Sequence, residues 1–252
     1  MRLARTGLTA VLLCIPLTAF SQEGSASTYS RLNTFSGFVE YSNDSSHMIL
    51  GDARNRKIGA LGFQYQRRLV NRRRWNLSYT AEMRPGMLES DPTWIYTNVI
   101  TAPASEAGVY PQAPVAVMRC VASSIAYITT LSSPTGPIVY SGDYVYTCSR
   151  RSVVEQSFSP AGMRFNLMPR RRLQLTFSSF GGYMFSTQEV PIPDAGSFNY
   201  IFEFGGGLEF FRSRNRSVRL EYQVQHYSNK KTAEYNPGVD SGLIKLTYAF
   251  GR

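Results

Sequence analysis

Short segments of alternating apolar and polar residues recur along the chain, separated by turns or polar loops. In the segment 218–228, one parity holds Val218, Leu220, Tyr222 and Val224, and the other holds polar residues. Side chains two apart in a strand share a face, so this period of two predicts a β-strand with one polar face. Eight such segments occur, near 35–41, 57–66, 75–82, 161–168, 173–185, 199–211, 218–228 and 242–250.

The connections between these segments alternate between tight, basic turns and long, polar loops. Short turns join antiparallel neighbours, and an even number of strands places both termini at the tight-turn end. With its aromatic-rich rows, this pattern predicts an all-β, eight-stranded antiparallel up-and-down transmembrane β-barrel. One long insertion, at about 83–157, is rich in Pro, Ser and Thr and is expected to be extracellular.

The charged residues of the strands share the parity opposite to the apolar rows. Hydrocarbon does not tolerate carboxylates, so we expect this parity to face the barrel interior as a paired polar network. A soluble lipocalin-type barrel would reverse the two faces. The expected inward residues are Glu40, Glu82, Arg164, Glu203, Glu209, Arg219, Glu221 and Lys245.

The N-terminal residues have the pattern of a secretory signal peptide. Arg2 and Arg5 precede an apolar run at 8–20, and Ala19-Phe20-Ser21 fits a cleavage site. We therefore predict a signal peptide at 1–21 and an outer-membrane barrel domain at 22–252.

Cys120 and Cys148 remain after the signal peptide, and an even count in an exported chain predicts a disulfide. A hairpin centred near Pro134 would place these two cysteines opposite each other. The net charge of +10 comes from arginines clustered at the tight turns, where they suit anionic lipid headgroups. Export argues against a nucleic-acid partner.

A possible site lies at the end of the segment 218–228. His226 and Ser228 continue its apolar row, and Asp240 follows across a short loop. Histidine, hydroxyl and carboxylate are the parts of a nucleophile, its base and the group that orients the base. The alternative interpretation is structural: two polar residues at the end of an apolar row mark the point where the strand leaves its buried zone. On the lipid-facing row, a hydrolase requires a lipid substrate.

The runs His226-Tyr227-Ser228-Asn229 and Asn236-Pro237-Gly238-Val239-Asp240 resemble the outer-membrane lipid A 3-O-deacylase (PagL-type) family, also labelled acyloxyacyl hydrolases. The resemblance implies hydrolysis of the ester-linked 3-hydroxyacyl chain of lipid A in lipopolysaccharide, without a cofactor. It also implies that Ser228 is the nucleophile and His226 its general base. Asp240 stands where the family usually has glutamate, and Glu234 is a second candidate for the orienting acid.

Further residues near this motif are candidates for binding the substrate. Asn229, Asn236 or backbone N–H groups could hold the oxyanion. Lys230 and Lys231 are candidates for contacts with lipid A phosphates, with solvated loop charges as the alternative. His47 is a second candidate base. Only two histidines exist and no cysteine pair has ligand spacing, so we expect no metal.

Two functions from different classes follow. The first is a lipid A deacylase of the outer membrane that acts on lipopolysaccharide, with a homodimer as one possible assembly. The alternative is a non-catalytic eight-stranded barrel with a structural or adhesive role that depends on the insertion.

Overall fold

The chain folds as a single sheet that closes into a ring. The structure, a computed structural model, describes residues 29–42 and 44–252, so the predicted signal peptide at 1–21 lies outside the described residues. In this described part, no helix is long and apolar enough to cross a membrane. The ring consists of β1 (Asn33–Ser42), β2 (Lys57–Asn71), β3 (Trp75–Ala102), β7 (Gly136–Leu167), β8 (Leu173–Ser186), β9 (Phe198–Ser213), β10 (Arg216–Ser228) and β11 (Val239–Gly251).

Every neighbouring pair in this ring is antiparallel. Strands that follow one another in the ring pair with each other. β3 pairs directly with β7, although three strands lie between them in the sequence, and β1 pairs with β11 to close the ring. A closed sheet has no free edge, so the backbone groups of the barrel wall are paired within the wall. These pairings confirm the predicted eight-stranded antiparallel barrel, with each of the eight segments in its expected place.

The two faces of the wall have opposite polarity. Apolar side chains on the outside are widely exposed, as for Phe63 at 62% and Leu220 at 56%. All eight charged residues expected on the inner face are buried, from 0% to 4% exposed. A wall that is apolar outside and charged inside suits a hydrocarbon surrounding and reverses the arrangement of a soluble barrel.

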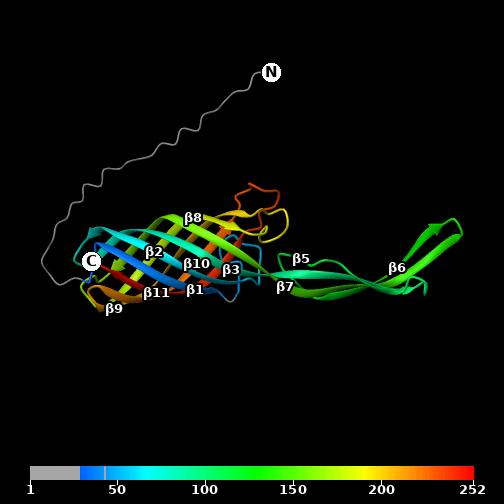
Figure 1. The fold of residues 1–252 in the computed structure, drawn as a ribbon, viewed down its shortest axis with the longest axis horizontal. Helices are drawn as coiled ribbons and strands as arrows, with labels where there is room; N and C mark the ends of the chain where they lie inside the picture. Colours follow the sequence, from blue (N-terminus) through cyan, green and yellow to red (C-terminus); the bar gives the residue numbers. More distant parts are fainter. Residues whose placement is uncertain (1–28, 43) are drawn as a thin grey trace, which may run out of the picture.

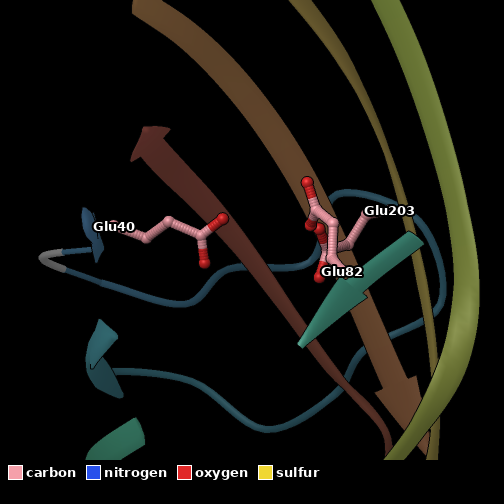
Figure 2. A group of neighbouring side chains, drawn as sticks. All are labelled: Glu40, Glu82 and Glu203. Carbon is pink, nitrogen blue, oxygen red and sulfur yellow. The ribbon is translucent and has the colours of Figure 1, made fainter. Parts of the chain in front are cut away.

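The inner charges form ion-paired clusters that fill the barrel. Figure 2 shows Glu40, Glu82 and Glu203, which come from three strands and have carboxylate oxygens within 4.8 Å of one another. The Arg84 guanidinium contacts all three, at 2.7, 3.2 and 2.7 Å, and Lys245 Nζ lies 3.0 Å from Glu40 and 2.5 Å from Glu82. Two cations therefore already neutralise much of the charge that a metal ion would meet there.

A second cluster lies nearer the tight-turn end of the barrel. Arg164 pairs with Glu221 at 2.5 Å, and Arg219 lies 3.0 Å from the other oxygen of Glu221. Arg31 pairs with Glu209 at 2.9 Å and closes this end of the interior. The barrel interior is therefore a packed polar network, as the sequence predicts for a barrel of this size.

The tight turns and the C-terminus lie at one end of the barrel (Figure 1). The Leu32 N–H donates to the Arg252 carbonyl at 2.8 Å, next to the turns at 72–74, 170–172 and 214–215. The arginines of these turns are exposed. The basic clusters therefore sit together at the end opposite the long connections, as the sequence predicts.

The predicted insertion is largely an extension of two barrel strands. Beyond the barrel rim, β3 and β7 continue side by side and are joined by β4 (Gly108–Pro111), β5 (Val115–Ala116) and β6 (Ser123–Ser133). Figure 1 shows this part projecting far beyond the barrel as a narrow, twisted ribbon. We call residues 91–154 the outer ribbon. The predicted disulfide is present, with a Cα–Cα distance of 5.8 Å between Cys120 and Cys148.

Candidate functional site

The candidate residues lie at the outer end of two neighbouring strands. β10 carries His226 and ends at Ser228, and Asp240 is the second residue of β11. In the antiparallel register, His226 lies directly opposite Asp240. Directly opposite residues share a face of the sheet, with Cβ atoms about 4.5–5.5 Å apart. Strand pairing thus brings together two side chains that are separated by a loop in the sequence.

The His226 ring and the Asp240 carboxylate form a short hydrogen bond. His226 Nδ1 lies 2.6 Å from Asp240 Oδ1, with the carboxylate fully buried and the ring 15% exposed. The carboxylate can only accept the hydrogen bond at this contact, so the neutral ring carries its hydrogen on Nδ1. Nε2 is then left with a lone pair, which is the form that a general base needs.

The other oxygen of Asp240 is held by the first outer loop, residues 44–56. The backbone N–H groups of Met48, Leu50 and Gly51 donate to Oδ2, each at 3.0 Å, and that of Ile49 donates to the same atom. Hydrogen bonds from backbone N–H groups favour the charged form of a carboxylate. The loop therefore fixes Asp240 as an anion that faces His226.

Two glycines permit this close packing. A Cβ on Gly51 would lie 2.4 Å from the Asp240 backbone nitrogen, so only glycine fits against the acid there. Gly238 has a φ of +61° and approaches His226 Cε1, to which an added Cβ would lie 3.1 Å away. The loops on both sides of the pair thus approach it through backbone atoms.

Ser228 lies two residues beyond His226 on the same outward face. Its side chain is half-buried, and its cross-strand neighbour is Tyr200. Among the described residues, no hydrogen bond joins Ser228 to His226. Two residues along a strand span about 6.6 Å, and hydrogen bonds at a catalytic site often tighten only when substrate binds. The structure therefore places all three groups on one surface but pairs only two of them.

The Asn229 side chain is engaged in holding its own loop. It is buried, and Nδ2 donates to the carbonyls of Ala195, at 2.6 Å, and Tyr235. Its Oδ1 accepts the N–H of Lys231 at 2.8 Å. Both amide hydrogens are therefore used, and the side chain has none left for an oxyanion in this arrangement. The predicted role in oxyanion binding thus does not match the contacts of Asn229.

The remaining candidates lie on the exposed rim. Asn236, Lys231 and Glu234 are exposed, and Glu234 makes no contact with His226 in the part of the chain that the structure describes. Lys230 Nζ lies 5.8 Å from the centre of the Tyr200 ring, beside Ser228. Of the two candidate acids, Asp240 is therefore the one that contacts the histidine.

His47 belongs to the first outer loop and not to the pair. Its Nδ1 donates to the Gly51 carbonyl at 2.8 Å and lies 3.9 Å from Asp52 Oδ1. This contact joins the loop to itself, next to the N–H groups that hold Asp240. His47 thus supports the loop conformation in this structure.

The sequence reasoning did not identify Arg56, which anchors the first outer loop. Its fully buried guanidinium lies 3.1 Å from Asp91 and 3.5 Å from Glu89, and Glu89 also accepts the Tyr227 hydroxyl at 2.7 and 2.8 Å. The Arg56 guanidinium also donates to the carbonyls of Arg54, Val117, Met118 and Pro191, at 2.9 to 3.2 Å. Nothing in the sequence separates Arg56 from the many arginines at the turns, so only the fold reveals it.

Comparison with known proteins gives one family. The family model described as "Lipid A 3-O-deacylase (PagL)" matches residues 129–249, a range that contains His226, Ser228 and Asp240. A search of curated proteins gives no match.

Solved structures with a similar arrangement include Neisserial surface protein A (NspA), at 6% identity and a TM-score of 0.39, covering 87% of this chain and 97% of that one. The outer membrane protein OprG from Pseudomonas aeruginosa has 9% identity and a TM-score of 0.37, covering 90% of this chain and 99% of that one.

Proposed function

Since residues 129–249 match the family model of lipid A 3-O-deacylases (PagL), which are ester hydrolases, we propose that this chain removes the ester-linked 3-hydroxyacyl chain of lipid A through Ser228, His226 and Asp240. The observation that supports these roles most is the contact of 2.6 Å between His226 Nδ1 and Asp240 Oδ1. It orients a histidine base on the same outward face as a serine hydroxyl.

The reaction is an acyl transfer in two halves. Ser228 Oγ attacks the ester carbonyl while His226 Nε2 takes the hydroxyl proton, which gives a tetrahedral intermediate. The C–O bond to the sugar then breaks, and the histidinium returns its proton to the sugar oxygen. In the second half, His226 activates water, which attacks the acyl-serine and releases the 3-hydroxy fatty acid and free Ser228.

Asp240 has two roles in this scheme. It keeps the Nδ1 hydrogen in place, so that Nε2 faces the serine, and its charge stabilises the histidinium that forms in each half of the reaction. The first outer loop holds the carboxylate rigidly while this happens, because four backbone N–H groups donate to Oδ2. A preoriented anion needs no reorganisation when the positive charge develops.

Backbone atoms are the best candidates for the oxyanion site, because the Asn229 side chain is engaged elsewhere. Within the described residues, the Lys230 N–H, two positions after Ser228, makes no hydrogen bond. We assign it as an oxyanion donor, and the charged ends of Lys230 and Lys231 as contacts for the lipid A phosphates. Asn236 is exposed at the same rim and is a further candidate for contact with the sugar.

The position of the site suits a membrane lipid. His226 and Ser228 lie on the outward face, which further along the same strand carries exposed Tyr222 and Leu220. An acyl chain can therefore stay in hydrocarbon while its ester reaches the rim, so the substrate need not leave the bilayer. We propose accordingly that the chain resides in the outer membrane after export and removal of residues 1–21. The size of the purified protein in detergent would distinguish a monomer from a homodimer.

Mass spectrometry of lipid A tests the proposal directly. Wild-type protein, folded in detergent, should remove one hydroxyacyl mass from lipid A, and Ser228→Ala should remove none. Ser217→Ala, a buried serine at the opposite end of the same strand, is the matched control for a lost hydroxyl. Loss of the acyl chain with Ser228→Ala would refute the role of Ser228. No loss with folded wild-type protein would favour the non-catalytic alternative.

A further inference from the structure

The outer ribbon has an aromatic face that the proposed catalysis does not use. Cross-strand register places Tyr96 opposite Tyr146, Trp94 opposite Cys148 and Tyr110 opposite Asn98, and residues two apart continue the same face. Every tyrosine of the ribbon falls on this face. We call it the tyrosine face, and its aromatic residues are Trp94, Tyr96, Tyr110, Tyr127, Tyr140, Tyr144 and Tyr146.

The rings of the tyrosine face form a continuous row. Ring centres are 5.5 Å apart from Trp94 to Tyr146, 5.4 Å from Tyr146 to Tyr96 and 5.5 Å from Tyr96 to Tyr144. Tyr127 extends the row, with its centre 4.3 Å from Tyr144 and the two planes 15° apart. The row therefore runs from the barrel rim along the ribbon, held in place by its own ring contacts.

The strands of the tyrosine face place no charged side chain on it, and the one carboxylate that contacts it comes from a turn, where Glu106 accepts the Tyr140 hydroxyl at 2.8 Å. Figure 1 shows the ribbon standing alone beyond the barrel. Trp94 and Tyr110 are exposed, and the other five rings are half-buried. Four of these five, all except Tyr140, contact one another. Between Trp94 and Cys148, the residues on this face of the four strands include no Asp, Glu, Lys or Arg. A large exposed aromatic face on a monomer marks a binding surface.

Rows of uncharged, hydroxyl-bearing rings suit a neutral sugar chain. The apolar C–H face of a pyranose packs on an aromatic ring, and tyrosine hydroxyls exchange hydrogen bonds with sugar hydroxyls at the ring edge. Phosphate or carboxylate ligands would instead require cations, which this face lacks. The chemistry of the face therefore selects for carbohydrate.

The position of the ribbon indicates which carbohydrate this is. The ribbon leaves the barrel at the end that carries the His226–Asp240 pair, on the wall across the ring from β10 and β11. The first outer loop spans the two sides, because Arg54 N donates to Met118 O at 2.8 Å while Asp240 Oδ2 accepts from Gly51. The sugars attached to a lipid A in the site extend away from the membrane at this same end.

We propose that the tyrosine face binds the polysaccharide of lipopolysaccharide and so retains the substrate whose lipid A occupies the barrel-wall site. The inference takes its ligand from the proposed function, but binding to the face does not depend on hydrolysis. It assigns the aromatic rings of the ribbon to substrate capture and leaves the chemistry to the barrel rim.

Binding is measured on the Ser228→Ala background with Trp75→Phe, so that Trp94 is the only tryptophan. The probe is lipid-free polysaccharide, released from lipopolysaccharide by mild acid. Titration should change Trp94 emission, and Tyr144→Thr should weaken binding about tenfold, since a lost ring contact is worth about one factor of ten. Val145→Thr, on the opposite face of the same strand, should bind like its parent.

A second measurement separates this inference from the proposed function. With intact Ser228, Tyr144→Thr should lower kcat/KM for full-length lipopolysaccharide and leave kcat/KM for lipid A without its polysaccharide unchanged. Equal polysaccharide affinity of Tyr144→Thr and Val145→Thr would overturn the inference, as would no binding to folded protein. Concentration-dependent dimerisation that Tyr144→Thr abolishes, without polysaccharide binding, would instead assign the face to a second copy. Polysaccharide binding that Tyr144→Thr weakens, in a protein that removes no acyl chain, would refute only the proposed function.

Discussion

Asp240→Asn changes the proposed site by replacing one oxygen with an NH₂ group. The structure determines where that group must go. Four backbone N–H groups point at the Oδ2 position and require an acceptor there, so the amide oxygen takes that place. The amide NH₂ is then forced toward His226 Nδ1, 2.6 Å away in the wild-type contact. The ring must accept at Nδ1 and carry its proton on Nε2, where the general base should be.

Two losses follow from this substitution. The carboxylate no longer stabilises the histidinium, and two unit charges about 4 Å apart interact by about 4 kcal/mol at an effective dielectric constant near 20. That energy corresponds to a factor of about 10³ in rate. The inverted tautomer adds a further cost, and the equivalent change in a serine protease lowers kcat by about 10⁴. We therefore expect Asp240→Asn to lower kcat by about 10³ to 10⁴ while the barrel stays folded.

The assay is the initial rate of 3-hydroxy fatty acid release from lipid A in mixed micelles, measured by mass spectrometry. Folding is checked by the heat-dependent shift of the barrel in gel electrophoresis. Asp240→Glu keeps the charge and should lose far less activity than Asp240→Asn. If folded Asp240→Asn kept kcat within about tenfold of wild type, the assignment of His226 as a base oriented by Asp240 would be wrong.

Two further predictions concern the loop and the interior. Gly51→Ala should lower kcat at least about tenfold without destabilising the barrel, because its Cβ would lie 2.4 Å from the Asp240 nitrogen. Gly37→Ala is the control, since no atom lies within 4 Å of its added Cβ, and it should behave as wild type in the same assay. Arg84→Met should lower the free energy of unfolding by about 3–5 kcal/mol, because it strips a buried carboxylate cluster of its main cation. Urea unfolding in lipid vesicles measures this, with exposed Arg216→Met as the control, and a loss below about 1 kcal/mol would contradict it.

The barrel could be predicted because a strand in a bilayer has two sharply different faces. The alternation of apolar and polar residues predicted the eight strands, and the charged residues indicated which face of each strand points into the barrel. Arg84 escaped this reasoning, although it is the cation that Glu40, Glu82 and Glu203 share. The predicted alternating segment ends at Glu82, so Arg84 fell within the expected insertion, although it shares the parity of Glu82 and is buried as that parity requires. The inward parity changes only beyond Arg84, where the next buried residue is Met87.

The outer ribbon shows where pattern and structure separate. The sequence from 83 to 157 contains prolines and many small polar residues, and it predicts an insertion with one hairpin near Pro134. The structure has this hairpin, between β6 and β7, but it also continues β3 as far as Ala102, which the sequence does not predict. Outside the barrel neither face of a strand is buried in a core, so the contrast that marks a strand in the sequence weakens. The ribbon keeps only its β-branched and aromatic residues as a signal.

In the proposed site, the first outer loop gives a physical account of an aspartate at position 240, where the resemblance to lipid A 3-O-deacylases implies a glutamate. Cross-strand pairing already sets His226 against Asp240, so a short side chain reaches Nδ1 directly. A short carboxylate stays close to the backbone of its own strand, and only a loop that folds down onto that strand can hold its second oxygen. Gly51 permits this approach, and buried Arg56 anchors the loop that makes it. Asp240, Gly51 and Arg56 therefore belong to one connected set of contacts.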